Sequence, residues 1–337
     1  MTIQTRKKPP TLSDVAKRAG VSRSLVSLAI RGEGYVRAES REKIAKAAQE
    51  LNYIPNLAAR MLASAQSSHI GTLVGNITNP LQAETAKWIT VLAGEHDQNA
   101  LLSLDADSDD KAEGAIDGLI LHRISSAILI GAPYEKAAIA RVAAKLPSVY
   151  IGRLLKAVEI DSVTTDHVLG AGLAVDHLVS VGCRKIVHLG GGASPGSQRM
   201  QQGYENAMAR HGLSEHIEVL VGSYSVDSGA SAGRVLFERD NLPEAVFACN
   251  DLAAIGLLNE AAKHGIAVPD ELCVVGYDDV TMSGSETLAL TTIHQSAHDL
   301  AEAGMKLLLR RLADPEASPN KTLVLPRLVV RRSTARQ

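Results

Sequence analysis

Apolar residues recur at helical spacing near the N-terminus, where the pattern predicts three short helices. Residues 11–14, Thr-Leu-Ser-Asp, match a capping box, so a helix is expected to begin at Leu12 and to end at Gly20. Ser22 is the expected N-cap of a second helix, and a third is expected over residues 39–52. Helix, short glycine-containing turn and helix form the helix-turn-helix unit. The expected inward residues are Leu12, Val15, Ala16, Ala19, Val26, Ala29, Ile30, Ile44, Ala48 and Leu51.

From residue 70 onward, short apolar runs rich in β-branched residues alternate with amphipathic helical stretches. This alternation predicts parallel sheets built from βαβ units. The runs exceed the number that one sheet holds comfortably, so we expect two doubly wound sheets, each flanked by helices. The runs are residues 70–74, 100–104, 127–130, 148–151, 185–189, 218–221, 245–249 and 273–275.

Polar residues follow many of these runs, at the positions where ligands bind in parallel sheets. Because the carboxyl ends of such strands meet at one edge, we expect these side chains to converge on a cleft for a small molecule. They are Asn79, Asp105, Arg153, Tyr224, Asn250, Asp251, Asp278 and Asp279.

The composition is that of a soluble globular protein with about two domains. Of 337 residues, 45% are hydrophobic and 21% are charged, and no run of about 18 apolar residues could span a bilayer. The basic, polar start of the chain lacks the apolar core of a secretory signal, so a cytoplasmic location is expected. Cys183, Cys249 and Cys273 are widely spaced, which favours small buried residues over metal ligands or disulfides.

Charge divides the chain into a basic head and an acidic body. Residues 1–66 hold 12 Lys and Arg against 5 Asp and Glu, a net charge of +7, whereas the whole chain has a net charge of −2. The remaining residues therefore carry −9. A small basic unit with apolar residues at helical spacing is typical of a nucleic-acid-binding module.

The head resembles the DNA-binding head of the lactose-repressor (LacI) family of bacterial transcription regulators. The segments that carry the resemblance are Thr11-Leu12-Ser13-Asp14-Val15-Ala16, Ala19-Gly20-Val21-Ser22, Val26-Ser27, Arg41-Glu42-Lys43-Ile44 and Leu51-Asn52-Tyr53-Ile54-Pro55-Asn56. The resemblance implies a DNA-binding domain over residues 1–55 and a hinge helix and linker over residues 56–69. In the hinge, Asn56 and Ala59 match family positions, and Leu62 matches the residue that wedges into the minor groove.

We expect the second helix to enter the major groove of DNA. Its first turn gives Arg23 and Ser24 the role of reading bases, and Leu28 is placed to touch a thymine methyl group. Family members often carry Thr at the position of Leu25 and a guanine-reading Arg at that of Leu28, so this chain lacks one such contact. The full set of expected DNA-binding residues is Thr11, Ser22, Arg23, Ser24, Ser27, Leu28, Arg31, Tyr53, Asn56, Ala59 and Leu62.

The body, residues 70–337, resembles the effector-binding and dimerisation domain of the same family. The matching segments are Thr78-Asn79-Pro80, Ile151-Gly152-Arg153, Asp176-His177-Leu178, residues 199–204, Phe247 to Asp251, Val275 to Asp279, residues 290–293 and residues 328–334. The resemblance implies a periplasmic-binding-protein-like fold with two subdomains. One spans about 70–163 and 294–323, and the other about 164–293 and 324–334.

The resemblance also implies a set of residues that bind the effector. Arg199, Asn250 and Asp278 match the trio that grips the effector, and Tyr224 takes the place of a stacking aromatic residue. Many family members carry an aromatic residue after Asn-Pro, where this chain has Leu81 and Gln82. The expected effector-binding residues are Asn79, Leu81, Arg153, Arg199, Tyr224, Asn250 and Asp278.

Three motifs resemble catalytic or metal-binding sites but lack a residue or group that the chemistry requires. Residues 192–196 match the G-x-S-x-G pattern of hydrolases, but Pro195 lacks the backbone N–H that the oxyanion hole requires after Ser194. The aspartates at 105–110 lack the glycine and glutamate of a calcium loop. His294 and His298 have helical spacing without a third ligand or a catalytic glutamate. We therefore expect no enzyme activity, metal or cofactor.

These observations predict a DNA-binding repressor at the nucleoid whose operator affinity is controlled by a small-molecule effector, such as a sugar or a related metabolite. The expected partners are a pseudo-palindromic double-stranded operator, the effector and a second copy of the chain, with no membrane. A small-molecule hydrolase with an appended basic targeting module, and an architectural DNA-binding protein with an inactive cleft, stay open as alternatives. The sequence leaves the effector, the operator and the direction of control unassigned.

Overall fold

The computed structural model describes residues 10–31, 34–53, 68–104, 108–131, 136–155 and 159–335, without the side chains of Arg31, Asp109 and Lys136. The chain divides into two compact units, Met1–Ser67 and Ser68–Gln337, which we call the head and the body. The predicted hinge residues up to Ser67 lie outside the described residues. His69, the last residue of the predicted linker, begins the first strand of the body.

The head consists of three described helices, α1 (Leu12–Ala19), α2 (Arg23–Arg31) and α3 (Ala38–Glu50). The predicted capping box is present, since Asp14 N donates to Thr11 Oγ1 (3.3 Å) and Thr11 N donates to the Asp14 carboxylate (2.8 Å). Gly20 ends α1 in the left-handed conformation (φ +68°), which glycine adopts at little cost. Leu25 N donates to Ser22 Oγ (3.2 Å), which confirms the predicted cap of α2.

A small hydrophobic core holds the three helices of the head together. The predicted inward residues Leu12, Ala19, Ala29, Ile30, Ala48 and Leu51 lie partly buried around this core. An ion pair between Arg18 and Glu50 also joins α1 to α3. The five fully buried members of the cluster are Val15, Ala16, Val26, Ile44 and Ala47.

The body contains two six-stranded sheets, as the alternating pattern predicts. The first sheet has the order β11-β5-β4-β3-β1-β2, and the second has the order β12-β10-β9-β8-β6-β7. Neighbouring strands are parallel, except for the antiparallel pair of β10 and β12. The strands of the first sheet are β1 (His69–Val74), β2 (Asn99–Ser103), β3 (Ser126–Ile130), β4 (Ser148–Ile151), β5 (Asp161–Thr165) and β11 (Lys321–Val324). Those of the second are β6 (Ile186–Leu189), β7 (Glu218–Leu220), β8 (Ala245–Ala248), β9 (Cys273–Asp278), β10 (Thr291–His294) and β12 (Arg327–Val329).

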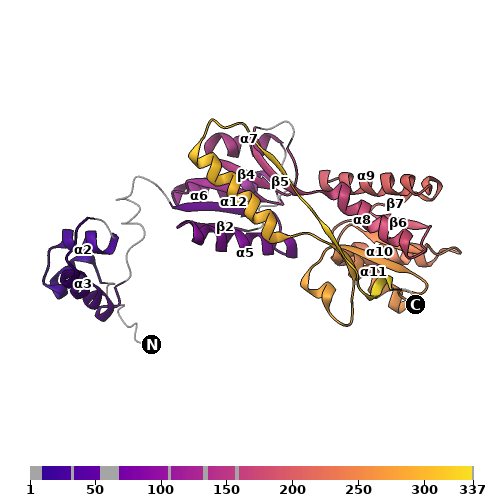
Figure 1. Cartoon of the computed structure of the whole chain (residues 1–337), viewed down its shortest axis with the longest axis horizontal. Coiled ribbons are helices and arrows are strands. Elements are labelled where there is room, and N and C mark those ends of the chain that lie inside the picture. Colours follow the sequence, from indigo (N-terminus) through magenta and orange to yellow (C-terminus); the bar gives the residue numbers. More distant parts are fainter. Residues whose placement is uncertain are drawn as a thin grey trace, which may run out of the picture. The chain divides into compact units, whose positions relative to one another are not determined.

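Helices cover both sheets and complete two halves of the body (Figure 1). The first half contains α5, α6, α7 and α12, and the second contains α8, α9, α10 and α11. We call the first sheet with its helices the first half of the body, and the second sheet with its helices the second half. The helices are α5 (Pro80–Glu95), α6 (Asp109–Leu121), α7 (Lys136–Lys145), α8 (His167–Ser180), α9 (Pro195–Arg210), α10 (Val226–Phe237), α11 (Asp251–Lys263) and α12 (Ala297–Ala313).

The chain crosses between the two halves three times. It crosses after β5, after β10 and after β11, and the last crossing leads directly into β12 (Figure 1, yellow). The boundaries expected at 163/164, 293/294 and 323/324 each fall inside one of these strands, and each crossing follows the strand's end. Three chain crossings therefore connect the two halves of the body.

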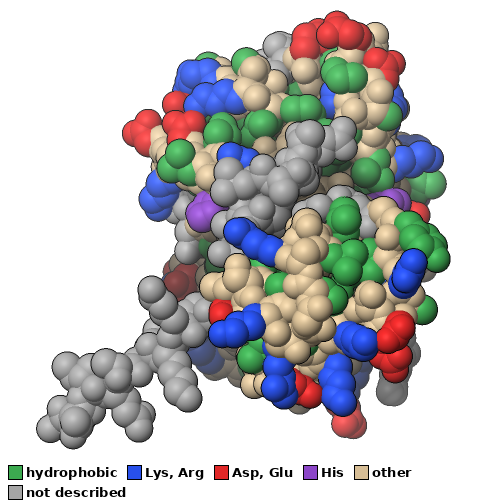
Figure 2. Space-filling model, turned by 90° about the vertical axis from the view of Figure 1, so that its left-hand side faces the viewer, with side chains coloured by type: hydrophobic (Ala, Val, Ile, Leu, Met, Phe, Trp, Pro, Cys, Tyr) green, Lys and Arg blue, Asp and Glu red, His purple; other side chains and the backbone are tan. Residues whose placement is uncertain are grey.

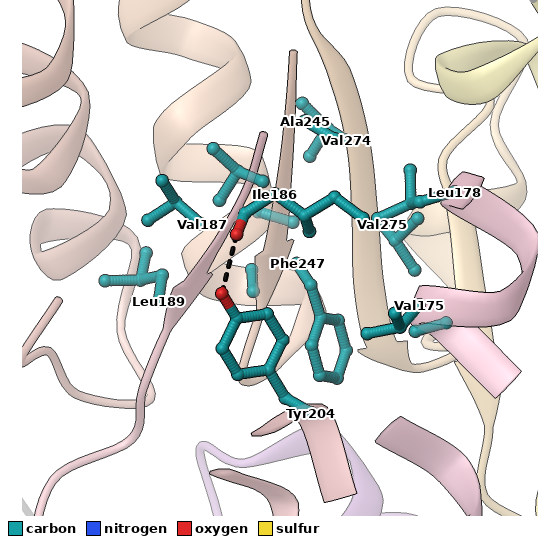
Figure 3. Packing of buried hydrophobic residues seen from close by; sticks show 14 of the residues in the cluster. Val175, Leu178, Ile186, Val187, Leu189, Tyr204, Ala245, Phe247, Val274 and Val275 are labelled. Atoms are coloured by element: carbon teal, nitrogen blue, oxygen red, sulfur yellow. Dashed lines mark hydrogen bonds between the residues drawn. The ribbon is translucent and has the colours of Figure 1, made fainter. Parts of the chain in front are cut away.

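The second half has a continuous core between its sheet and helices. Phe247 and Tyr204 belong to one cluster with aliphatic residues of β6, β8, β9 and α8, and the Tyr204 hydroxyl donates to the carbonyl of Ile186 (2.6 Å, Figure 3). The predicted small buried cysteines, Cys183, Cys249 and Cys273, are buried and unbridged. The first half has two hydrophobic clusters, one that includes Ile89 of α5 and one that includes Ile116 of α6.

Candidate DNA-binding surface and ligand cavity

Helix α2 presents the side chains that were predicted to read DNA. Arg23 and Ser24 are exposed in its first turn, and Ser27 and Leu28 are half-buried farther along. Lys and Arg side chains are dispersed among hydrophobic and acidic ones on the face that Figure 2 shows. The exposed first turn of α2 is the part of this helix that enters the major groove in helix-turn-helix proteins.

The other predicted DNA-contacting residues lie outside the first turn of α2 and differ in burial. Thr11 is exposed, and its hydroxyl also serves the cap of α1. Tyr53 is partly buried against the small core of the head. Arg31 ends α2, and its side chain lies outside the described structure. Asn56, Ala59 and Leu62 also lie outside the described residues, so their roles stay predictions from the resemblance.

A cavity of about 650 Å³ lies at the carboxyl ends of the strands, where residues of both halves of the body meet. This is the position that the polar strand ends predicted. We call it the main cavity. Its lining residues from the first half include Asn79, Leu81, Gln82, Gly131, Tyr150, Arg153 and Thr165, and those from the second half and the crossings include His167, Ser194, Pro195, Tyr224, Asp278 and Gln295.

The first-half wall is fixed by the start of α5. Asn79 Oδ1 accepts from Gln82 N (3.2 Å) and caps the helix, and Leu81 follows in its first turn. Gln82 Oε1 accepts from Asn76 N (2.9 Å), and its amide lies against Gly131, where no side chain would fit. The Arg153 guanidinium lies 5.4 Å from the centre of the Tyr150 ring. Backbone caps and this stacking therefore position the polar atoms of the wall.

The second-half wall is centred on Asp278. Its backbone has a positive φ of 113°, rare for a residue with a side chain, and its carboxyl accepts from Gln295 Nε2 (2.6 Å). Burial and the nearby charge of Asp251 raise the pKa of Asp278 well above its usual value. Asp279 differs, because its carboxylate pairs with Arg331 (2.7 Å) and with His294 (2.9 Å). Of the predicted aspartate pair, Asp278 is thus the one in the main cavity whose carboxyl carries no ion pair with a described residue.

Tyr224 and Ser194 meet at the rim of the main cavity. Their hydroxyl oxygens are 3.3 Å apart, and the Tyr224 ring lies so close to Gly191 that a side chain there would collide with it. Burial raises the pKa of Tyr224 to about 12, so its hydroxyl stays protonated. Tyr224 can therefore offer both an aromatic face and a hydrogen-bond donor.

His167 occupies the first crossing between the halves and was not predicted as a site residue. It is the first residue of α8, and its ring contacts Thr164 Oγ1 (3.4 Å) of the first half and the Tyr277 hydroxyl (3.1 Å) of the second. Burial and the positive charge of Arg199 lower the pKa of His167 to about 4. A neutral imidazole therefore bridges the two halves beside the cavity.

Six of the seven predicted effector residues line cavities, and one does not. Asn79, Leu81, Arg153, Tyr224 and Asp278 line the main cavity. Arg199 lines an adjoining cavity of about 350 Å³, which we call the side cavity. Asn250 does not line either cavity, because its side chain caps α11 by accepting from Ala253 N (2.9 Å) and donates to the Tyr224 carbonyl (3.5 Å).

Sequence reasoning also missed Gln82 and Gln295, which line the main cavity. Gln82 was noted only as a departure from the family. Gln295 follows β10, a strand that the apolar pattern did not predict. The polar residue directly after that strand is the signal that would have found it.

The residues of the rejected hydrolase pattern have structural contacts of their own. Ser194 caps α9 by accepting from Ser197 N (3.2 Å), and Pro195 opens the helix. His294 is engaged with Asp279. Among the described residues, the ligand atoms of His298, Asp299 and Glu302 lie within 4.8 Å of one another, so His298 does have acidic neighbours that spacing alone did not reveal. All three are at least partly exposed, and exposed acidic groups gather in this way without a metal.

Family models match both units of the chain. Residues 11–56 match the model for bacterial regulatory proteins of the lacI family, and residues 175–334 match a periplasmic binding protein-like domain. A solved LacI transcriptional regulator from a Rhodococcus species is 30% identical, with a TM-score of 0.74 over 79% of this chain and 98% of that one. The chain belongs to the lacI family. It is therefore a DNA-binding transcriptional regulator with a periplasmic-binding-protein-like body.

Relatives of the whole chain agree with this assignment. Catabolite control protein A of Priestia megaterium is 28% identical over 96% of this chain and 99% of its own length. The ribose operon repressor of Escherichia coli (strain K12) is 29% identical over 96% and 99%. A lac repressor dimer bound to operator and the anti-inducer ONPF has a TM-score of 0.86 at 29% identity, over 97% of this lacI-family chain and 99% of that one. These relatives are transcriptional regulators and not enzymes.

Proposed function

We propose that this lacI-family protein represses transcription by binding an operator as a homodimer, and that a small polar ligand in the main cavity controls its affinity for the operator. The observation that carries the proposal is the main cavity itself, which residues from both halves of the body line in a chain with a helix-turn-helix head. A ligand that touches both halves stabilises one arrangement of them over another, which is the physical requirement for control.

The chemistry of the main cavity fits a ligand with several hydroxyl groups. Asp278, Gln295, Asn79 and Gln82 supply donors and acceptors, and Thr165 has a buried hydroxyl without a hydrogen-bond partner among the described residues. A volume of about 650 Å³ is ample for a monosaccharide or disaccharide. Structures of related regulators hold ribose (Enterococcus faecium) and cellobiose, which supports a carbohydrate or a similar metabolite here.

The operator contact requires two copies of the chain. One three-helix head reads only a few base pairs, and a symmetric dimer reads a pseudo-palindrome. The lac repressor that resembles this chain is bound to its operator as a dimer. We infer the same assembly, with Arg23 and Ser24 reading bases and Ser27, Arg31 and Tyr53 contacting phosphates.

The protein performs no chemistry on its ligand in this proposal, in which Ser194 has the role of a helix cap. The site of action is the cytoplasm, where the nucleoid lies. No helix among the described residues is long and apolar enough to cross a membrane.

Operator selection from genomic fragments, followed by fluorescence anisotropy with D-ribose, cellobiose and related metabolites, tests the proposal. We expect sequence-selective binding whose affinity at least one ligand changes tenfold or more. Asp278→Ala removes the acceptor in the main cavity and should abolish that response while DNA binding without ligand stays as in wild type. Equal binding to operator and random DNA would refute the regulatory function.

A further inference from the structure

The side cavity has a charge composition that differs from that of the main cavity. It shares Gly152, Arg153, Thr164, His167, Pro195 and Gly196 with the main cavity, so the two adjoin along the first crossing. Arg199 and Arg153 both line the side cavity, and no acidic residue is among its described lining residues. Two arginines without a lining carboxylate form a cationic recess beside the polar main cavity.

Arg199 is poised for a partner that the described chain does not supply. Its Nε is buried without a hydrogen-bond partner, and Arg199 forms no ion pair with any described residue. A buried donor on a charged group that lacks a partner is costly, so such groups are normally satisfied. Burial and, after it, the positive charge of Arg199 lower the pKa of His167, so protonation of this neighbouring imidazole is disfavoured.

The start of α9 adds to the positive potential of the side cavity. Pro195 and Gly196 of its first turn line both cavities, and α9 is a helix of 16 residues whose N-terminal dipole favours anions. Gln198 and Gln202 on the same helix supply uncharged amide groups. The arginines, the helix start and the amides together offer many donors.

We propose that the effector carries an anionic group, a carboxylate or a phosphate on a sugar-like body, and that Arg153 and Arg199 hold this group in the side cavity while the hydroxyl-bearing body occupies the main cavity. The inference rests on the proposed effector-binding function and adds the chemical class of the ligand. Arginine pairs with carboxylate and phosphate through two parallel hydrogen bonds, which a neutral hydroxyl cannot match.

Thermal unfolding of the full chain, followed by fluorescence of its single tryptophan, Trp88 in the body, tests the proposal. The probes are D-glucose, D-glucuronate, D-glucose 6-phosphate and inorganic phosphate, each compared with sodium chloride at equal ionic strength. We expect at least one acidic probe to raise Tm while D-glucose at the same concentration has a smaller effect. Glucuronate and glucose 6-phosphate distinguish a carboxylate from a phosphate.

Substitutions of the two arginines test whether the acidic probes bind in the side cavity. Arg199→Gln and Arg153→Gln should each lower the affinity for the acidic probe at least tenfold. Each should lower the affinity for D-glucose by a smaller factor, because a neutral sugar has no charged group to pair with the guanidinium. Arg199→Lys keeps the charge and should retain part of the binding. Arg210→Gln is the matched control, because Arg210 lies at the other end of α9, where it pairs with exposed Asp176.

Two results would overturn the inference. One is stabilisation by acidic probes that is absent, or is equal in wild type, Arg199→Gln and Arg210→Gln. The other is a neutral sugar that binds as tightly as its acidic derivatives. Operator anisotropy on the same variants separates this outcome from a failure of the proposed function. If a neutral sugar controls operator binding, only the charge assignment fails, whereas an acidic ligand that binds without any effect on operator affinity contradicts the control mechanism.

Discussion

The head and the body of this protein bury hydrophobic residues on very different scales. Among the described residues of the head, the core cluster has five buried members, whereas the second half of the body alone has a continuous cluster that includes Tyr204, Phe247 and Tyr277. The head therefore depends on single side chains and on its helix caps. The body can accommodate strained or charged groups at its cavity, such as Asp278 with its positive φ, because a large core stabilises the surrounding fold.

Removing one core side chain should affect the head most. Ile44→Ala deletes a side chain that is 3% exposed from this small cluster and should cost about 2–5 kcal/mol, enough to unfold the head. Calorimetry of the full chain should show the head transition lost and the body transition unchanged. Ile44→Val, with a cost of about 0.5–1.5 kcal/mol, should keep DNA binding. If Ile44→Ala lowered the Tm of the body transition as much as that of the head transition, the two units would not unfold separately.

Acid should destabilise the body and leave the head almost unaffected by histidine protonation, because residues 1–66 contain no histidine. Burial lowers the pKa of His188 from 6.5 to about 4. Between pH 6.5 and pH 4, His188 therefore binds a proton in the unfolded chain but not in the folded body. The stability that His188 contributes is present above pH 6.5 and is lost as pH falls through 4, by about 3 kcal/mol.

Urea unfolding monitored at Trp88 measures this loss between pH 7 and pH 4. His188→Gln removes the titrating group, so its stability should fall less over that range than that of wild type. His122→Gln changes an exposed histidine and serves as the control. The same pH dependence in wild type and His188→Gln would contradict the assignment.

These contrasts also show what the sequence could predict. The head was predicted closely, because Thr11, Gly20 and Ser22 act on backbone groups within three or four residues of themselves. The eight apolar runs correspond to β1 to β4 and β6 to β9. Strands β5, β10, β11 and β12 were not predicted. In β5 the reason is that Asp161 and Thr164 are polar although buried, and that Asp161 accepts from the distant backbone N–H of Asn320.

The same reason explains which cavity residues were missed. His167 and Gln295 come shortly after β5 and β10, so they were invisible to a search that read only the ends of apolar runs. Asn250 was assigned from the resemblance, and only the structure shows that its amide is used in the cap of α11. Local patterns predicted the elements, whereas the crossings depend on pairing between residues more than 100 positions apart.

A substitution on the surface of the head should have a smaller effect, on operator binding instead of stability. Arg23→Ala removes an exposed side chain at the start of α2 and should weaken operator binding by about 1–3 kcal/mol per half-site, with less preference among base sequences. Competition anisotropy with operator and random DNA measures both quantities. Lys17→Ala in α1 is the control for loss of a positive charge. If Arg23→Ala and Lys17→Ala weaken both DNAs to the same extent, Arg23 does not read bases.

The smallest effect concerns the helix cap. Thr11→Ala removes the hydroxyl that accepts from Asp14 N and should destabilise the head by about 1 kcal/mol. Calorimetry should show a lower head transition, with the body unchanged. Ser225→Ala removes the corresponding cap of α10 in the body, where it accepts from Ser228 N, and is the matched comparison. An unchanged head transition in Thr11→Ala would show that the cap does not limit its stability.

We propose that ligand binding in the body and DNA binding by the head are coupled in one equilibrium. Calorimetric titration of the ligand that shifts operator binding, with and without saturating operator, tests this most directly. Linkage requires the operator to change the ligand affinity by the same factor by which the ligand changes the operator affinity, typically about 1–3 kcal/mol of coupling. We predict two different ligand affinities in wild type. Equal ligand affinities with and without operator, when both partners bind, would show that the two sites are not coupled.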